Sequence, residues 1–275
     1  MMDVSYMMPE HAYHAIKAFS SSWAKSKTPA HAQAGFQQND SMRLGSAVHS
    51  VLLGGKRVVE LPDLKFNTKE GKEEAREQLQ ILTQNANADF SSKDDFHRQI
   101  QELDLIVLSG NEAKTQMGMV NAVKAHPIAS RLLELGRPEV SITGTYPMYE
   151  VPAKARLDWI GPDYVMDLKT ASDASETGFM RAAYNFGYHI QAAFYVDMAQ
   201  LAQFGVNEFY FVVVENSAPF AVNVFRADPA FIEAGREDYQ VKLEQYAECL
   251  KADHWPAYDH SIKTLDLPRW AKVPA

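Results

Sequence analysis

The chain contains a single cysteine and no long apolar run, and both shortages exclude classes of protein. Cys249 alone can form neither an internal disulfide nor a zinc site built from several thiolates. No apolar run approaches the roughly 20 residues that a membrane-spanning helix needs. The opening residues, Met-Met-Asp-Val-Ser-Tyr, lack the basic and apolar regions of a secretory signal. We therefore expect a cytoplasmic protein with no membrane partner, in which Cys249 is a buried bystander.

Basic residues are also in short supply. The net charge is −8 at pH 7, because 27 Lys and Arg residues face 35 Asp and Glu residues. A protein that coats nucleic acid by bulk electrostatics needs an excess of positive charge, so this class is disfavoured. An enzyme that acts on DNA is not excluded. Metal-binding carboxylates add to the negative count, and basic groups can be concentrated in one channel.

Several catalytic motifs are missing as well. The sequence has no G-x-x-x-x-G-K-[ST] and no G-x-G-x-x-G stretch, so loops that bind ATP or dinucleotides have no support. It has no H-E-x-x-H and no G-x-S-x-G elbow. The nine histidines are scattered without the spacing of metal ligands. These absences leave chemistry based on carboxylates as the main option.

The composition is typical of a folded globular protein, with 46% hydrophobic and 23% charged residues and no low-complexity tract. A chain of 275 residues can bury a full-size core as one domain. We expect a single domain over residues 1–275 with three parts. These are a mainly helical lobe over 1–137, a β-rich core over 138–228, and a C-terminal helix and tail over 229–275.

Hydrophobic periodicity and turn residues divide the first half into mostly helical segments. The hydroxyls of Ser20 to Ser22 are candidate helix caps, and Gly54-Gly55 ends a helix that carries His49. The expected elements are a helix over 13–26, a loop over 27–40, a helix over 43–53, a short strand over 57–61, and helices over 72–135 with breaks near 85–91, at Gly110 and at Pro127.

The second half is rich in β-branched and aromatic residues separated by turn signals such as Gly161-Pro162-Asp163. Three consecutive strands here predict an antiparallel meander. The full set comprises strands over 140–145, 149–159 and 164–169, a helix over about 178–205, strands over 208–215 and 221–226, and a final helix over 229–250. This order predicts an α/β fold with a mixed central sheet.

Asp167 and Lys169 are two apart in a predicted strand, so their side chains share one face while Leu168 points into the core. A simple ion pair explains most triplets of this kind. Metal-dependent hydrolysis of a phosphodiester also needs this pair. The carboxylate binds Mg²⁺ or Mn²⁺, and the lysine orients or deprotonates water and offsets charge on the phosphorane.

Asp158 ends the preceding strand, and the hairpin brings it near Asp167. Asp158 could be a surface carboxylate beside a turn. Two neighbouring acids cost stability unless a cation is bound, which favours a metal-binding role. Glu139, just before the first strand of the meander, is either a further carboxylate of the site or a charge at the strand edge.

Gln191 and Tyr195 are four apart and lie on one helical face. They could contact the scissile phosphate, or they could be an ordinary surface amide and a tyrosine at the edge of the core. His49 follows Gly45-Ser-Ala-Val, and these small residues permit close approach of a helix or a ligand. A single histidine on an apolar helix is more often a packed residue than a ligand.

Taken together, these residues resemble the RecB-like branch of the PD-(D/E)XK nuclease superfamily, and more closely the C-terminal nuclease family of RecE, exonuclease VIII. The Arg-Leu-Asp at Asp158 replaces the superfamily's Pro-Asp, as is usual in this branch. The matching motifs are Gly45…His49, Glu139, Asp158, Asp167-Leu168-Lys169 and Gln191…Tyr195, with Ser20 to Ser22, Pro29-Ala30, Gly187 to Gln191 and Leu267-Pro268-x-Trp270 around them.

The resemblance implies a PD-(D/E)XK core with a mixed sheet flanked by helices and a helical N-terminal lobe. It also implies a 5′-to-3′ exonuclease that degrades linear double-stranded DNA from its ends and leaves 3′ single-stranded overhangs. A single-strand annealing protein of RecT type would use these overhangs in recombination. Members of the group form rings, so a homo-oligomeric ring is implied, with a tetramer favoured over a trimer. The chain looks like a stand-alone catalytic module of phage type.

The site residues have the following expected roles. Asp158, Asp167 and the Leu168 carbonyl hold one or two Mg²⁺ ions, with Mn²⁺ as a substitute, and His49 or Glu139 completes the coordination. Lys169 positions or activates the water, and Gln191 and Tyr195 orient the phosphate. The candidates for contacts with the DNA backbone are Arg43, Arg156 and Arg181.

Two alternatives stay open. One is an endonucleolytic or Cas4-like relative, although relatives that carry an iron–sulfur cluster need several cysteines and this chain has one. The other is a non-catalytic DNA-binding module of the same fold, which predicts loss of a metal carboxylate or of the lysine. All of these groups are present.

Overall fold

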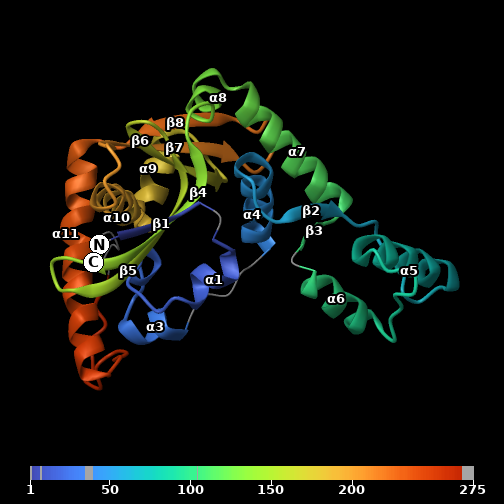
Figure 1. Ribbon diagram of the computed structural model, residues 1–275, viewed down its shortest axis with the longest axis horizontal. Coiled ribbons are helices and arrows are strands. Elements are labelled where there is room, and N and C mark those ends of the chain that lie inside the picture. The colour runs from blue at the N-terminus through green and yellow to red at the C-terminus, as the bar shows by residue number, and fades with distance from the viewer. Residues whose placement is uncertain (1, 7, 35–39, 104, 268–275) are drawn as a thin grey trace, which may run out of the picture.

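A computed structural model describes residues 2–6, 8–34, 40–103 and 105–267 of the protein. Its centre is a sheet of six strands in the order β1-β4-β5-β6-β7-β8 (Figure 1). Strands β6 and β7 are parallel and the other neighbours are antiparallel, so the mixed α/β sheet and the antiparallel meander expected from the sequence are confirmed. The strands are β1 (Met2–Ser5), β4 (Arg137–Tyr146), β5 (Val151–Ile160), β6 (Tyr164–Ala171), β7 (Glu208–Glu215) and β8 (Val222–Arg226).

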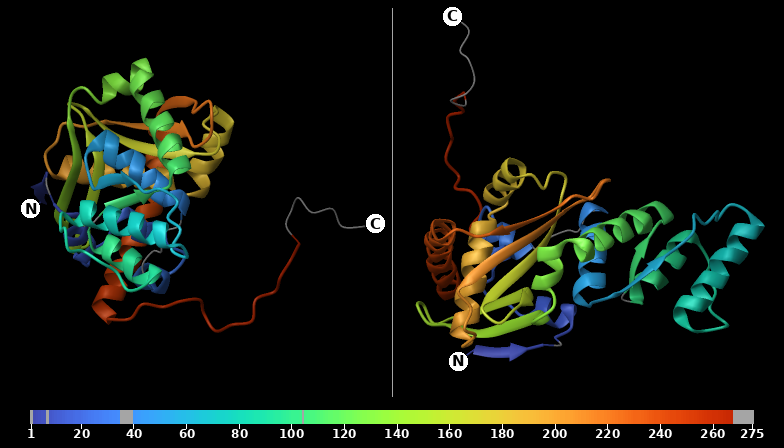
Figure 2. Two further views of the ribbon diagram at one scale, coloured as in Figure 1. Left: turned by 90° about the vertical axis from the view of Figure 1, so that its right-hand side faces the viewer. Right: turned by 90° about the horizontal axis from the view of Figure 1, so that it is seen from above.

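Helices cover both faces of this sheet (Figure 2), and each face has its own apolar cluster. The larger cluster packs four helices on one face: α2 (Ser21–Ala24), α9 (Glu176–Asn185), α10 (Tyr188–Leu201) and α11 (Pro229–Ala252). The smaller cluster packs three helices on the other: α4 (Asp40–Leu53), α7 (Gly110–Ala125) and α8 (Pro127–Leu132). The ends of β5 and β6 therefore lie between α10 on one side and α4 on the other.

A smaller lobe projects from this body, with α5 (Lys69–Thr83) and α6 (Lys93–Glu102) far from α11 (Figure 1). It has its own apolar cluster. The helices expected over 72–135, with breaks near 85–91, at Gly110 and at Pro127, are present as α5, α6, α7 and α8. The expectation missed β3 (Leu105–Leu108), which pairs in parallel with β2 (Arg57–Glu60). The Leu-Ile-Val-Leu run of β3 alternates in burial, as a strand does.

Two expectations near the N-terminus are also wrong. Residues 13–26 do not form one helix, since α1 (Glu10–Ala15) and α2 are separated by an extended stretch at Phe19. The backbone of Phe19 pairs with β5, accepting from Lys154 N–H at 2.8 Å, and this pairing outweighs the local helical pattern. Ser20 caps α2 by accepting from the Trp23 N–H, as the sequence predicts. The expected loop over 27–40 contains α3 (Pro29–Ala34).

The single helix expected over 178–205 is two helices, α9 and α10, separated at Gly187. Gly187 has φ of +65°, a left-handed conformation that glycine adopts without steric cost. Helix α10 is buried on nearly every side, as its composition of Ala, Phe, Val and Met requires. It packs closely on α11 because Gly235 has no side chain, and a Cβ there would lie 2.0 Å from the His189 carbonyl oxygen.

The chain leaves the body after α11. Trp255 packs its ring against Trp23 and Tyr246, and residues 257–267 are exposed (Figure 2). Leu267 of the expected terminal motif is exposed, while Pro268 and Trp270 lie outside the described residues. Among the described helices, none has the length and apolar character needed to cross a membrane. Cys249 is buried, as expected.

Candidate active site

Three acidic residues lie in a row across three neighbouring strands. The register of β4 with β5 places Glu139 opposite Asp158, and the register of β5 with β6, continued by one residue, places Asp167 beside Asp158. Like charges directly opposite one another destabilise a sheet. Such a row is costly as a purely structural device, and it is the arrangement expected of a site that binds a cation.

Irregular backbone at this row directs the side chains. The ladder between β5 and β6 ends at the pair Trp159 and Met166, and beyond it the Leu168 N–H donates to Asp158 Oδ2 at 2.9 Å. Glu139 has φ of +52°, which is uncommon and costly for a residue other than glycine. Strands β5 and β6 thus separate at the acidic residues. The Asp158 carboxylate replaces the backbone carbonyl that would otherwise accept from the Leu168 N–H.

His49 reaches the same point from α4 on the other side of the sheet. Its Nε2 lies 2.7 Å from the Leu168 carbonyl oxygen, and its Nδ1 lies 3.4 Å from Asp158 Oδ2. Gly45, one turn earlier, permits this approach, because a Cβ there would lie 3.2 Å from the Thr170 hydroxyl oxygen on β6. The small residues before His49 therefore serve close packing of α4 on β6.

The donor atoms of His49, Glu139 and Asp158 fit a divalent cation. One ligand atom from each residue lies within 4.8 Å of the other two. A carbonyl oxygen only accepts hydrogen bonds, so the contact with Leu168 places the proton of a neutral His49 ring on Nε2. The Nδ1 lone pair then faces the Asp158 carboxylate, and a cation or a proton between them removes the repulsion. Imidazole and carboxylate together are a common ligand set for catalytic metals.

Electrostatics in this group follow from burial and like charge. Burial, and then the neighbouring Asp167 carboxylate, raise the pKa of Asp158 well above its usual range. Burial lowers the pKa of His49, which favours the neutral ring that a metal ligand requires. Arg156 Nε donates to Glu139 Oε2 at 2.5 Å, so one carboxylate of the group is held in place by a guanidinium. We call His49, Glu139, Asp158 and Arg156 the metal half of the site.

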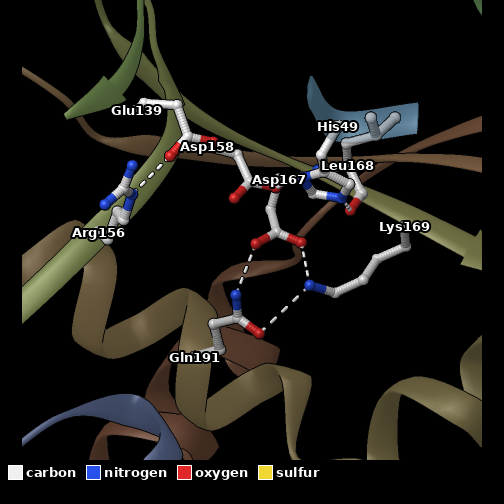
Figure 3. A network of polar contacts seen from close by, with 8 residues as sticks. All are labelled: His49, Glu139, Arg156, Asp158, Asp167, Leu168, Lys169 and Gln191. Atoms are coloured by element: carbon white, nitrogen blue, oxygen red, sulfur yellow. Dashed lines mark hydrogen bonds and ion pairs between the residues drawn. The ribbon is translucent and has the colours of Figure 1, made fainter. Parts of the chain in front are cut away.

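A second group lies on the α10 side of the same strands (Figure 3). Asp167 is 1% exposed, forms an ion pair with Lys169, and accepts from Gln191 Nε2 at 2.5 Å. Lys169 Nζ also donates to Gln191 Oε1 at 3.4 Å. The shared face of Asp167 and Lys169 and the inward position of Gln191 are thus observed. Burial alone would lower the pKa of Lys169, but Asp167 and Asp158 outweigh burial and raise it.

Lys25 belongs to this group and was not expected from the sequence. Its Nζ donates to Gln191 Oε1 at 3.2 Å, although 166 residues separate the two. No local spacing could reveal such a contact. The motif residues Ser20 to Ser22 and Pro29-Ala30 flank Lys25 in the sequence but do not include it. We call Lys25, Asp167, Lys169 and Gln191 the lysine half of the site.

Tyr195 lies one turn beyond Gln191, but its ring belongs to the larger apolar cluster. Burial raises the pKa of Tyr195 well above its usual range, and the Ser21 side chain on α2 only partly offsets this rise. Tyr195 therefore packs α10 against α2.

The three candidate arginines lie in different environments. Arg43 forms an ion pair with Glu112 and lines a cleft of about 650 Å³ beside β3, Arg156 is bound to Glu139, and Arg181 is exposed on α9. A contact between any of them and DNA stays a prediction.

Comparison with known proteins agrees with this geometry. The family model described as a PDDEXK-like domain of unknown function (DUF3799) matches residues 13–267, so the chain belongs to that family. The six-stranded mixed sheet and the aligned acids and lysine thus define a nuclease-type domain of the PD-(D/E)XK superfamily. Nucleases of this superfamily usually use divalent metal ions, and His49, Glu139 and Asp158 are a suitable donor set.

A solved structure from Eubacterium rectale, described as a "Putative exonuclease", shares the fold with a TM-score of 0.57. The two chains are 12% identical over 90% of this chain and 88% of that one. A second structure, SSO0001, is 13% identical over 75% of this chain and 88% of that chain, with a TM-score of 0.26 that carries no argument. No curated protein sequence matches the chain. The family match supports the PD-(D/E)XK superfamily and not the RecE family in particular, and the likeness to the Eubacterium rectale structure shows a shared fold.

Proposed function

We propose that this chain is a Mg²⁺-dependent exonuclease that degrades linear double-stranded DNA from 5′ to 3′, with Mn²⁺ as a substitute metal. One observation carries the nuclease part: the two halves adjoin at β6, where Asp158 of the metal half accepts a hydrogen bond from the Leu168 N–H, between Asp167 and Lys169 of the lysine half. The exonuclease activity, its polarity and the choice of Mg²⁺ rest on the resemblance of the motifs to the RecE nuclease family.

The residues divide the chemistry between them. His49, Glu139 and Asp158 would hold the metal, with Asp167 and the Leu168 carbonyl beside it. A bound divalent ion supplies Lewis-acid polarisation of the phosphate and of the attacking water. The ammonium of Lys169 orients that water and offsets negative charge on the phosphorane.

Gln191 and Tyr195 position Asp167 and Lys169. Gln191 holds both Asp167 and Lys169 through one amide, so it fixes the distance between acid and ammonium. Tyr195, buried one turn along α10, acts through the position of the helix rather than by touching phosphate.

The resemblance also supports proposals about partners and location. The 3′ overhangs would be passed to a single-strand annealing protein of RecT type in recombination. A homo-oligomeric ring, a tetramer before a trimer, would enclose the duplex and give persistence that a net charge of −8 does not supply. Arg43 and Arg181 are proposed to contact the DNA backbone, whereas Arg156 is proposed to act by holding Glu139. The protein is proposed to act in the cytoplasm.

The test is digestion of a linear duplex labelled at one 5′ or one 3′ terminus, with Mg²⁺ or with EDTA. We expect Mg²⁺-dependent release from the 5′ terminus first. Release from the 3′ terminus first would overturn the polarity, and cleavage of closed circular duplex would point to an endonuclease. Asp167→Ala should abolish digestion while leaving the fold intact. Asp94→Ala, an exposed acid on α6, is the matched control.

A further inference from the structure

The lysine half carries more positive charge than its single carboxylate balances. Lys25 and Lys169 both donate to Oε1 of Gln191, at 3.2 and 3.4 Å. Asp167 already pairs with Lys169. Both ammoniums also lie over the ring of Tyr188, at 5.8 Å for Lys25 and 4.7 Å for Lys169 from the ring centroid. Two like charges thus contact one amide oxygen and one aromatic ring, and an anion between them would stabilise both.

The fold holds Lys25 in this place through several independent contacts. Ser20 caps the short helix α2, and Trp23 is buried in the larger apolar cluster, so the backbone leading to Lys25 is fixed. Gly187 leaves room for the lysine stem, since a Cβ there would lie 3.0 Å from Lys25 Cγ and 3.2 Å from its Cδ. Burial and the neighbouring Lys169 ammonium lower the pKa of Lys25 to about 8, so its charge is kept there at a cost in free energy.

We infer that Lys25 binds a phosphate group of the DNA beside the phosphate that is cut. The inference rests on the proposed nuclease function and adds a contact to it. An ammonium on a flexible stem is a common binder of phosphate as a point charge. Lys169 lies beside Asp167 and acts at the scissile phosphate, while Lys25 approaches the same amide from α2 and meets the next phosphate. The alternative is a structural lysine that only orients the Gln191 amide.

Salt dependence separates these two roles. Binding of a fluorescently labelled linear duplex to the full chain is measured by anisotropy at several NaCl concentrations, with Ca²⁺ in place of Mg²⁺ to slow cleavage. Each phosphate contact contributes about −0.9 to the slope of log K against log [salt]. Lys25→Met should reduce the magnitude of the slope by about 0.9. Lys25→Arg should keep it, and so should Lys251→Met, the control at an exposed lysine on α11.

An unchanged slope in Lys25→Met, with a thermal unfolding curve like that of the wild type, would overturn the inference. Lys25→Arg covers the case in which Lys25→Met does not fold. A salt-dependence slope reduced by about 0.9 in Lys25→Arg, which keeps the positive charge, would also contradict phosphate binding. If the wild type binds duplex DNA without cutting it, the proposed function fails while the slope comparison still reports on Lys25.

Two sources of phosphate can be told apart with the same variants. The duplex is prepared with either a 5′-phosphate or a 5′-hydroxyl at its ends. An equal change of slope on both substrates supports a phosphodiester within the strand. A change confined to the 5′-phosphorylated duplex places the contact at the terminal phosphate. No change on either substrate contradicts both.

Discussion

The two halves of the site use the same kinds of residue in opposite balance. In the metal half, Glu139 and Asp158 face one guanidinium, Arg156, with a neutral imidazole beside them. In the lysine half, two ammoniums face one carboxylate, Asp167. The first half is left with negative charge when its acids are ionised, and the second with positive charge. One half therefore suits a cation and the other an anion, as hydrolysis of a phosphodiester requires.

Strand β6 joins the halves. Asp167 and Lys169 point toward α10, whereas the backbone of Leu168 between them serves the metal half through its N–H and its carbonyl. Variants that damage one half of the site and leave the other intact test whether the two halves have separate roles.

The largest effect is expected from Lys169→Ala, which removes the ammonium from the lysine half. Loss of a group that handles protons or charge in the transition state lowers kcat by about 10²–10⁴-fold. The metal half should be unaffected, so Mg²⁺ should still raise the melting temperature of the variant. Steady-state digestion and thermal unfolding with and without Mg²⁺ measure the two effects, with Lys124→Ala, an exposed lysine on α7, as control. Wild-type activity in Lys169→Ala would remove Lys169 from the mechanism.

Arg156→Met should damage the metal half alone. It releases Glu139 from the guanidinium that holds it, and loss of such a supporting contact weakens metal binding by about 10–100-fold. At saturating Mg²⁺ the kcat should return close to that of the wild type. Activity titrated against Mg²⁺ gives both quantities, and Arg131→Met provides an exposed control on α8. A lowered kcat with unchanged Mg²⁺ dependence would instead indicate that Arg156 contacts DNA.

A smaller effect on stability is expected from Gly187→Ala. The left-handed backbone at φ of +65° costs an L-residue about 1–2 kcal/mol, and the added methyl group crowds the stem of Lys25. Urea unfolding should show this loss of stability. The anisotropy titration should show a weaker salt dependence of DNA binding, because the position of Lys25 is disturbed. Gly205→Ala, where an added Cβ meets nothing within 4 Å, is the matched control. Equal stability of the two variants would show that Gly187 imposes no constraint.

The smallest effect is a gain of stability in Asp158→Asn measured in EDTA. The pKa of Asp158 is raised in the folded state, so the carboxylate destabilises the fold once pH rises above its unfolded value of about 3.9. The neutral amide removes this penalty, so the melting temperature in EDTA at pH 7 should rise, by about 2–4 °C for each kcal/mol regained. The difference should shrink as pH falls toward 4. A destabilised Asp158→Asn at pH 7 would contradict the assigned like-charge repulsion.

Short-range pattern was sufficient for the strands and for the faces of their side chains. Asp167 and Lys169 share a face because strand periodicity is fixed by geometry, and the hairpin of β5 and β6 brings Asp158 beside them. Gln191 was placed on the correct helix for the same reason. These predictions need only residues that are close in sequence.

The features that could not be predicted from the sequence depend on contacts between segments that are far apart in the chain. Lys25 meets Gln191 only because α2 packs against α10. Phe19 is extended because it pairs with β5, and β3 is a strand because β2 lies beside it. At Phe19 and at β3, strand pairing overrides a local pattern that is compatible with a helix.

Leu168 gives the site a mechanical dependence on the apolar core. Its side chain is buried in the same cluster as Val48, the residue before His49, while its two backbone groups contact Asp158 and His49. A substitution that loosens this cluster would move both proposed metal ligands together, without touching either of them. Residues of the cluster, such as Met166 and Val212, are therefore positions where inactivating substitutions would be found far from any DNA or metal contact.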